Sequence, residues 1–135
     1  MKIITNSERE TYDFAYNFAK EIKDNEVICL NGDLGAGKTV FVRGFAKYFG
    51  INETSSPTFA IVNEYNGDRD IYHFDVYRLS DEEEFYNIGG EEYFDRGICI
   101  IEWSHNIVDA LPPKRIEITI EKIDDTTREI NVDRL

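Results

Sequence analysis

Two short segments of the chain are apolar at every position, and a third segment alternates. Residues 27–30 and 98–101 carry only apolar side chains, which predicts strands buried on both faces of a sheet. Over residues 114–123, isoleucine alternates with polar residues, and residues 128–132 return after a polar turn. This second pattern predicts an antiparallel hairpin with one face on the core and the other in water.

Helical spacing of apolar residues appears in two places. Residues 7–10 have the sequence of a capping box, so we expect a helix that begins at Ser7 and ends near residues 24–25. Phenylalanines recur near helical spacing after residue 40, and Gly50 stands where a helix C-cap falls. The second helix is therefore expected over residues 40–49.

A second hairpin is expected around residues 66–68, where an Asn-Gly turn separates two strand-like segments. These segments span residues 59–65 and 70–77. Because side chains alternate along a strand, four residues of the second segment share one face. They are Ile71, His73, Asp75 and Tyr77. The two polar groups on this face, His73 and Asp75, are more than solubility requires.

The segment between the first apolar strand and the second helix carries the clearest chemistry. Residues 32–39 match G-x-x-x-x-G-K-[ST], the phosphate-binding loop of P-loop proteins. Glycines let backbone amides approach phosphates, Lys38 reaches the β- and γ-phosphates, and Thr39 offers its hydroxyl to Mg²⁺. The strand before and the helix after argue against a glycine-rich turn without a ligand. We expect nucleotide contacts at Asp33, Leu34, Gly35, Ala36, Gly37, Lys38, Thr39 and Val40.

These elements predict an α/β fold: a P-loop NTPase-like mixed sheet flanked by helices, with antiparallel hairpins. A strand at residues 3–4, a capped helix over 79–85 and a helical turn at 91–94 complete the prediction. At 135 residues, the chain is expected to form a single domain, residues 1–135.

Charge and composition exclude some classes of protein. Fifteen lysines and arginines against 27 acidic residues give a net charge of −12, which argues against a stand-alone nucleic-acid binder. No apolar run approaches membrane-spanning length, and the first residues lack the core of a signal peptide. Cys29 and Cys99 lie in apolar runs, as buried thiols in a reducing compartment would. We therefore expect a cytoplasmic protein with no membrane partner.

Two carboxylates compete for the metal site. Glu102 ends the second apolar strand, and ligands of open α/β sheets gather at that end of a strand. Asp75 is the alternative; it could bind the metal through water or orient the attacking water. His73 is more often a core histidine than a catalytic base, and Trp103 either packs or lines the phosphate site.

Three classes of function remain open from the residues alone. They are an ATPase that drives a partner, a small-molecule kinase, and a nucleotide-dependent binding module without appreciable turnover. The chain has no arginine-rich insertion of the kind that kinase lids use, and no Asn-Lys-x-Asp motif that reads guanine. Hydrolysis of ATP is the simplest phosphoryl transfer that these parts support.

The motifs together resemble the TsaE (YjeE) family. The resemblance rests on residues 32–39, 56–59, 73–79 and 101–103, in register over nearly the whole chain. It implies the bacterial ATPase component of the machinery that forms threonylcarbamoyladenosine in tRNA. That component uses ATP as its substrate and Mg²⁺ as its cofactor. It works with a TsaB–TsaD pair and interacts with tRNA only indirectly.

The resemblance also implies roles for single residues. Thr39 and Glu102 would bind Mg²⁺, Asp75 would act in catalysis or bind the metal through water, and Lys38 and Trp103 would act at the reacting phosphate. Departures from the family pattern are Ser104, where many members have proline, and Val40, where some have a second threonine. Ser56, Pro57 and Thr58 would form a switch-like loop, and nucleotide contacts would extend to Asn6, Glu8 and Arg128.

Overall fold

A computed structural model describes residues 1–23, 25–54 and 61–135. Within these ranges, seven strands form one mixed sheet in the order β1-β7-β6-β2-β5-β4-β3, which confirms the predicted α/β fold. The strands are β1 (Lys2–Thr5), β2 (Val27–Asn31), β3 (Val62–Tyr65), β4 (Ile71–Asp75), β5 (Ile98–Glu102), β6 (Ile116–Lys122) and β7 (Arg128–Arg134). The helices are α1 (Glu8–Ala19), α2 (Lys38–Tyr48) and α3 (Glu82–Asn87), with 3₁₀ segments η1 (Gly90–Asp95) and η2 (Ser104–Ala110).

The two fully apolar segments lie at the centre of the sheet. β2 pairs in parallel with β5 on one side and with β6 on the other, and β4 runs parallel to β5. The antiparallel hairpins β3–β4 and β6–β7 occupy the two flanks, and β1 adds to β7. The predicted strand types are thus confirmed, and the carboxyl ends of β2, β4 and β5 lie at one edge of the sheet.

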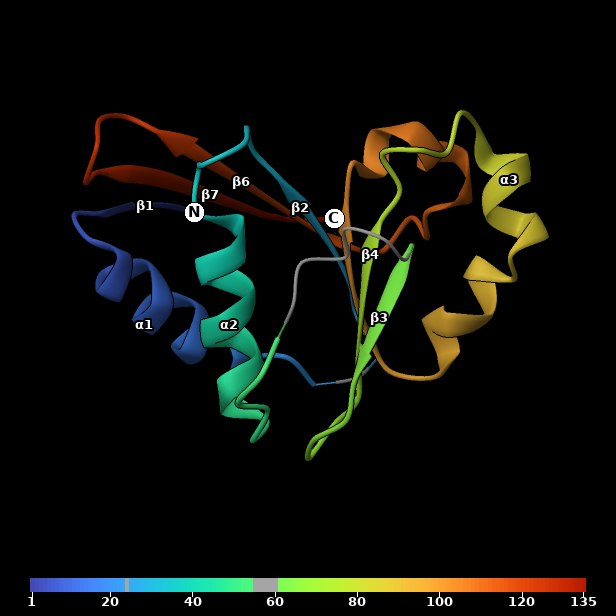
Figure 1. Cartoon of the computed structure of the whole chain (residues 1–135), viewed down its shortest axis with the longest axis horizontal. Coiled ribbons are helices and arrows are strands. Elements are labelled where there is room, and N and C mark those ends of the chain that lie inside the picture. The colour runs from blue at the N-terminus through green and yellow to red at the C-terminus, as the bar shows by residue number, and fades with distance from the viewer. Residues whose placement is uncertain (24, 55–60) are drawn as a thin grey trace.

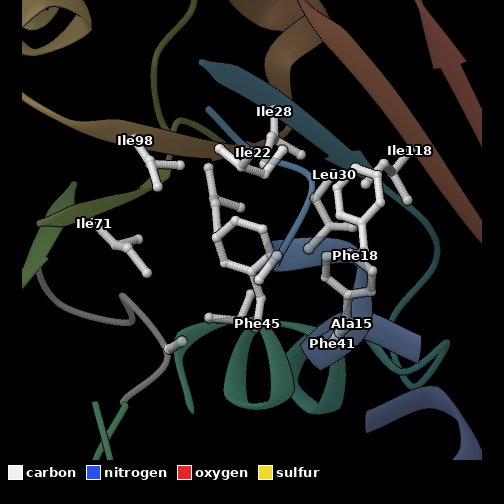
Figure 2. Close-up of a cluster of buried hydrophobic side chains, with 14 of the residues drawn as sticks. Ala15, Phe18, Ile22, Ile28, Leu30, Phe41, Phe45, Ile71, Ile98 and Ile118 are labelled. Atoms are coloured by element: carbon white, nitrogen blue, oxygen red, sulfur yellow. The ribbon is translucent and has the colours of Figure 1, made fainter. Parts of the chain in front are cut away.

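Each face of the sheet is covered by a different layer (Figure 1). Helices α1 and α2 cover one face, and α3, η1 and η2 cover the other. On the first face, Phe41 and Phe45 of α2 point toward Ile28 and Leu30 of β2 (Figure 2). On the second face, Cys29 and Cys99 are buried free thiols, as expected, and burial raises the pKa of each to about 12.

Helices α1 and α2 approach each other closely at Gly44. A Cβ at Gly44 would lie 2.3 Å from the carbonyl oxygen of Tyr12. Only glycine therefore lets the backbone of α1 pack against α2 without a shift of one helix. This contact fixes the position of α2, whose first turn carries Lys38 and Thr39.

Helix α1 begins as predicted but ends early. The Ser7 side chain caps it by accepting a hydrogen bond from the Glu10 N–H, and the Glu10 carboxylate accepts one from the Asn6 N–H. The helix ends at Ala19, not near residues 24–25. Beyond Ala19, the backbone N–H groups of Glu21 and Ile22 donate to carbonyls three residues earlier, as in a 3₁₀ turn, and the α-helical pattern stops. Ile22 remains buried in the core beyond the helix end.

Helix α3 begins later than residue 79, at Glu82, because Asp81 provides the cap. No element was predicted over residues 104–110, where η2 lies. Within the described ranges, no helix is both long and apolar enough to cross a membrane.

Candidate nucleotide site

A cavity of about 500 Å³ opens at the carboxyl edge of the sheet. The phosphate-binding loop and the start of α2 form its floor. One wall comes from the start of α1, including Glu8 and Thr11, and a second from the β6–β7 turn with Arg128. Asp75, Glu102 and Trp103 from the ends of β4 and β5 complete the lining. A volume of this size suits a small-molecule ligand such as a nucleotide.

The glycines of the loop have the backbone that the motif requires. Gly32 has φ +156°, and a Cβ there would lie 2.5 Å from the carbonyl oxygen of Ile120 on β6. Gly37 has φ +108°, in the left-handed region, and stands at the N-cap of α2. The loop can therefore turn directly from β2 into α2, with the amides of the first helical turn facing the cavity.

Lys38, Glu102 and His73 form a buried chain of polar contacts. The Lys38 ammonium lies 3.3 Å from Glu102 Oε1, and His73 Nε2 lies 2.6 Å from Glu102 Oε2. The side chains of Lys38 and Glu102 are only 14% and 12% exposed. The lysine of the loop and the carboxylate of β5 thus form an ion pair at the floor of the cavity.

The Glu102 carboxyl group is held in its ionised form. Burial alone raises its pKa, but the hydrogen bond from His73, the charge of His73 and the ammonium of Lys38 outweigh burial. The net result is a pKa below the ordinary value for glutamate. A carboxylate that stays ionised inside a partly buried site is suited to bind a cation.

Asp75 lies beside Glu102 but in a different environment. The two residues are paired in the register of β4 and β5. Asp75 is half-buried, and its Oδ1 accepts a hydrogen bond from the backbone N–H of Tyr77. Asp75 thus lines the cavity with a carboxylate that accepts one backbone hydrogen bond, whereas each oxygen of Glu102 is bound by a side chain.

Trp103 follows Glu102 with an unusual backbone. Its φ of 63° is left-handed, and no other non-glycine residue of the described chain has a positive φ. The residue is 38% exposed, and its ring packs edge-on against Tyr77 with its centre 5.8 Å from the Lys38 ammonium. The strained turn holds the indole over the lysine, where it also screens the ammonium from water.

Arg128 binds the loop itself. Its Nε donates to the carbonyl of Ala36 at 2.9 Å, and its Nη2 donates more weakly to the carbonyl of Gly35 at 3.3 Å. Its Nη1 donates to the carbonyls of Asp124 and Thr127 in the β6–β7 turn. The guanidinium thus connects the phosphate-binding loop to the hairpin, a role that its position in the sequence did not reveal.

The structure distributes the other predicted nucleotide contacts unevenly. Glu8, Leu34, Gly35, Gly37, Thr39 and Val40 line the cavity. Ala36 is buried, and Asp33 borders a smaller neighbouring cavity of about 180 Å³. Asn6 is exposed just before α1, where its backbone binds Glu10. The predicted switch-like residues Ser56, Pro57 and Thr58 lie outside the described residues.

The donor atoms at this edge suit magnesium. Mg²⁺ takes oxygen ligands and is held by one or two carboxylates together with phosphates and waters. The Thr39 hydroxyl and the carboxylates of Glu102 and Asp75 all line the cavity. The residues present therefore fit the metal that the loop motif implies.

Comparison with known proteins gives consistent matches. Residues 5–130 match the family model described as threonylcarbamoyl adenosine biosynthesis protein TsaE. The tRNA threonylcarbamoyladenosine biosynthesis protein TsaE of Bacillus subtilis is 45% identical over 96% of this chain and 83% of its own length. That of Treponema pallidum is 37% identical over 98% of this chain and 99% of its own. The crystal structure of YdiB from Bacillus subtilis superposes with a TM-score of 0.82 at 41% identity, covering 96% and 82% of the two chains.

Proposed function

This chain belongs to the TsaE family of tRNA threonylcarbamoyladenosine biosynthesis proteins, and we propose that it hydrolyses ATP with Mg²⁺ as one component of that biosynthesis. The observation that carries the proposal is the contact of Lys38 with Glu102 at the floor of the cavity. It brings the lysine of the loop and the acid of β5 to one point, where a phosphate and its cation would sit.

The residues divide the work by their positions. The amides of the loop and the first turn of α2 bind the phosphates, and the Lys38 ammonium leaves Glu102 to neutralise the transferred group. Thr39 and Glu102 would hold the metal, which when bound neutralises charge on the β- and γ-phosphate oxygens. Trp103 covers the lysine and excludes water from one side of the reacting group.

Asp75 is the candidate that orients the attacking water. Its carboxylate lines the cavity next to Glu102 and is not engaged by Lys38, which pairs with Glu102. A carboxylate at this position accepts a hydrogen bond from water and directs its lone pair toward the phosphorus. Water-mediated binding of the metal by Asp75 is compatible with the same position.

The partner is proposed to be a protein pair that resembles TsaB–TsaD. The net charge of −12 opposes direct binding of an RNA backbone. In this arrangement, the partner pair binds the tRNA, and this chain supplies hydrolysis that permits repeated turnover.

The decisive experiment is a phosphate-release assay of the pure protein, with and without the partner pair. Release that requires Mg²⁺ and increases with the partner supports the proposal. Phosphate that appears on a small molecule would indicate a kinase, and tight ATP binding without turnover in any mixture would indicate a binding module. The variant Glu102→Ala should lose the Mg²⁺-dependent release of phosphate while the protein stays folded.

A further inference from the structure

We propose that His73 is a positioning residue: it fixes the Glu102 carboxylate in the orientation needed for the metal when Lys38 leaves for the phosphates. The inference rests on the proposed function, because it assigns the support of the metal-binding acid. His73 lies on β4 and is not one of the residues that line the cavity.

The surroundings of His73 do not explain a histidine. The residue is 3% exposed in the middle of β4, paired with Ile100 on β5 and Asn63 on β3. Of its two neighbours on the same face, Ile71 is apolar and fully buried, and Asp75 is half-buried where the strand reaches the cavity. A residue that only filled this space would be apolar too, since a buried imidazole must be desolvated.

The polar contacts of His73 point in one direction. Nε2 lies 2.6 Å from Glu102 Oε2, whereas Nδ1 is buried with no hydrogen-bond partner in the described part of the chain. Because a carboxylate only accepts, the ring nitrogen that faces it carries the proton and donates. The imidazole therefore gives up hydration at both nitrogens and gains one strong contact, which is to Glu102.

The two partners of Glu102 differ in what holds them. Lys38 reaches Oε1 from the first turn of α2 with a long, flexible side chain. His73 reaches Oε2 from a strand inside the sheet, with a short side chain and a ring that is packed on all sides. When a nucleotide draws the ammonium to its phosphates, Oε1 loses its partner and Oε2 keeps its own. Because His73 still holds Oε2, the carboxylate of Glu102 does not rotate, and Oε1 stays in position for the metal.

The test separates binding of the metal from binding of the nucleotide. A fluorescent ADP analogue is titrated with and without Mg²⁺, and the ratio of the two dissociation constants measures the coupling. His73→Leu should reduce this ratio about tenfold, which is a typical effect of removing a hydrogen-bond partner of a metal ligand. The dissociation constant measured without Mg²⁺ should stay within about twofold. His73→Gln, whose amide N–H can occupy the position of Nε2, should retain most of the coupling.

Ile71→Val is the matched control, because it opens space on the same face of the same strand without touching Glu102. It should leave the coupling unchanged. Thermal unfolding of every variant confirms that the protein compared is folded.

Each other result counts against the inference. Coupling that survives in His73→Leu but is lost in Glu102→Gln would refute the role of His73 and leave the proposed function intact. Equal loss in His73→Leu and His73→Gln, or an equal fall of metal-free affinity, would show general damage to the site rather than positioning. No effect of Mg²⁺ on the unmodified protein would overturn the proposed function and this inference together.

Discussion

The two ends of the cavity are built on different principles. At the phosphate end, defined by Lys38, Glu102 and His73, the side chains are largely buried, and both oxygens of Glu102 are bound by the other two residues. At the hairpin end, defined by Glu8, Thr126 and Arg128, Glu8 and Thr126 are exposed, and the strongest contacts run from the guanidinium to backbone carbonyls.

The difference predicts how each end tolerates change. A buried charge that loses its partner bears the full cost of desolvation, so single substitutions at the phosphate end should have large effects. Contacts to backbone carbonyls do not depend on the identity of the residues that bear them, and exposed groups can be resolvated. Substitutions at the hairpin end should therefore change affinity by smaller factors.

The largest effect is expected from Lys38→Ala. The substitution removes the cation that we propose binds the phosphates and leaves Glu102 without its ammonium, so nucleotide affinity should fall by about a hundredfold or more. Calorimetric titration with ATP measures the change. Lys47→Ala, on the exposed last turn of the same helix, is the control and should bind ATP normally. Normal binding by Lys38→Ala would show that the cavity is not the phosphate site.

Glu102→Gln should separate the two functions of the phosphate end. Mg²⁺-dependent hydrolysis should fall by about a hundredfold, because a neutral amide replaces the carboxylate that we propose binds the metal. Metal-free ATP should bind a few times more tightly, since Lys38 no longer has a carboxylate to leave. Steady-state kinetics and metal-free titration give the two values, with the exposed Glu121→Gln as control. Weaker metal-free binding would mean that the Lys38–Glu102 pair prepares the lysine rather than competing for it.

Arg128→Ala should have an intermediate effect. Without the guanidinium, the carbonyls of Gly35 and Ala36 lose their donors and the loop becomes less ordered, which should weaken ATP binding by about tenfold. Hydrolysis of bound ATP, measured in single turnovers, should change little. Arg134→Ala, on the same strand but bound to Glu21, serves as the comparison. A change of a hundredfold or more would place Arg128 on the nucleotide itself.

The smallest effect is expected in the choice of base. The chain lacks a guanine-reading motif, so ATP should bind about threefold to tenfold more tightly than GTP. Competition between the two nucleotides for one fluorescent analogue measures this ratio directly. A clear preference for GTP would refute the adenine assignment.

Short-range sequence patterns single out most residues of the phosphate end. The apolar strands, the glycine motif and Glu102 at a strand end all follow from short-range patterns, and the structure places them together. The face shared by His73 and Asp75 was also predicted, but the bond of His73 to Glu102 was not, because it depends on the register between β4 and β5.

Features that depend on contacts distant in sequence remained hidden. Arg128 is expected from the sequence only as a nucleotide contact, and its bond to Ala36, 92 positions earlier, depends on the hairpin folding beside the loop. The contact of Gly44 with Tyr12 depends on how two helices cross. Trp103 carries a positive φ that no residue preference suggests, since the left-handed region favours glycine.

The pairing of β2 also limits when this strand can join the sheet during synthesis. The loop ends at residue 39, but within the described chain β2 pairs only with β5, which begins at Ile98, and with β6, which begins at Ile116. On the ribosome, the β3–β4 hairpin can form from adjacent segments, whereas β2 must wait for strands made long after it. Because Arg128 also supports the loop, these loop contacts can form only after residue 128 has been made.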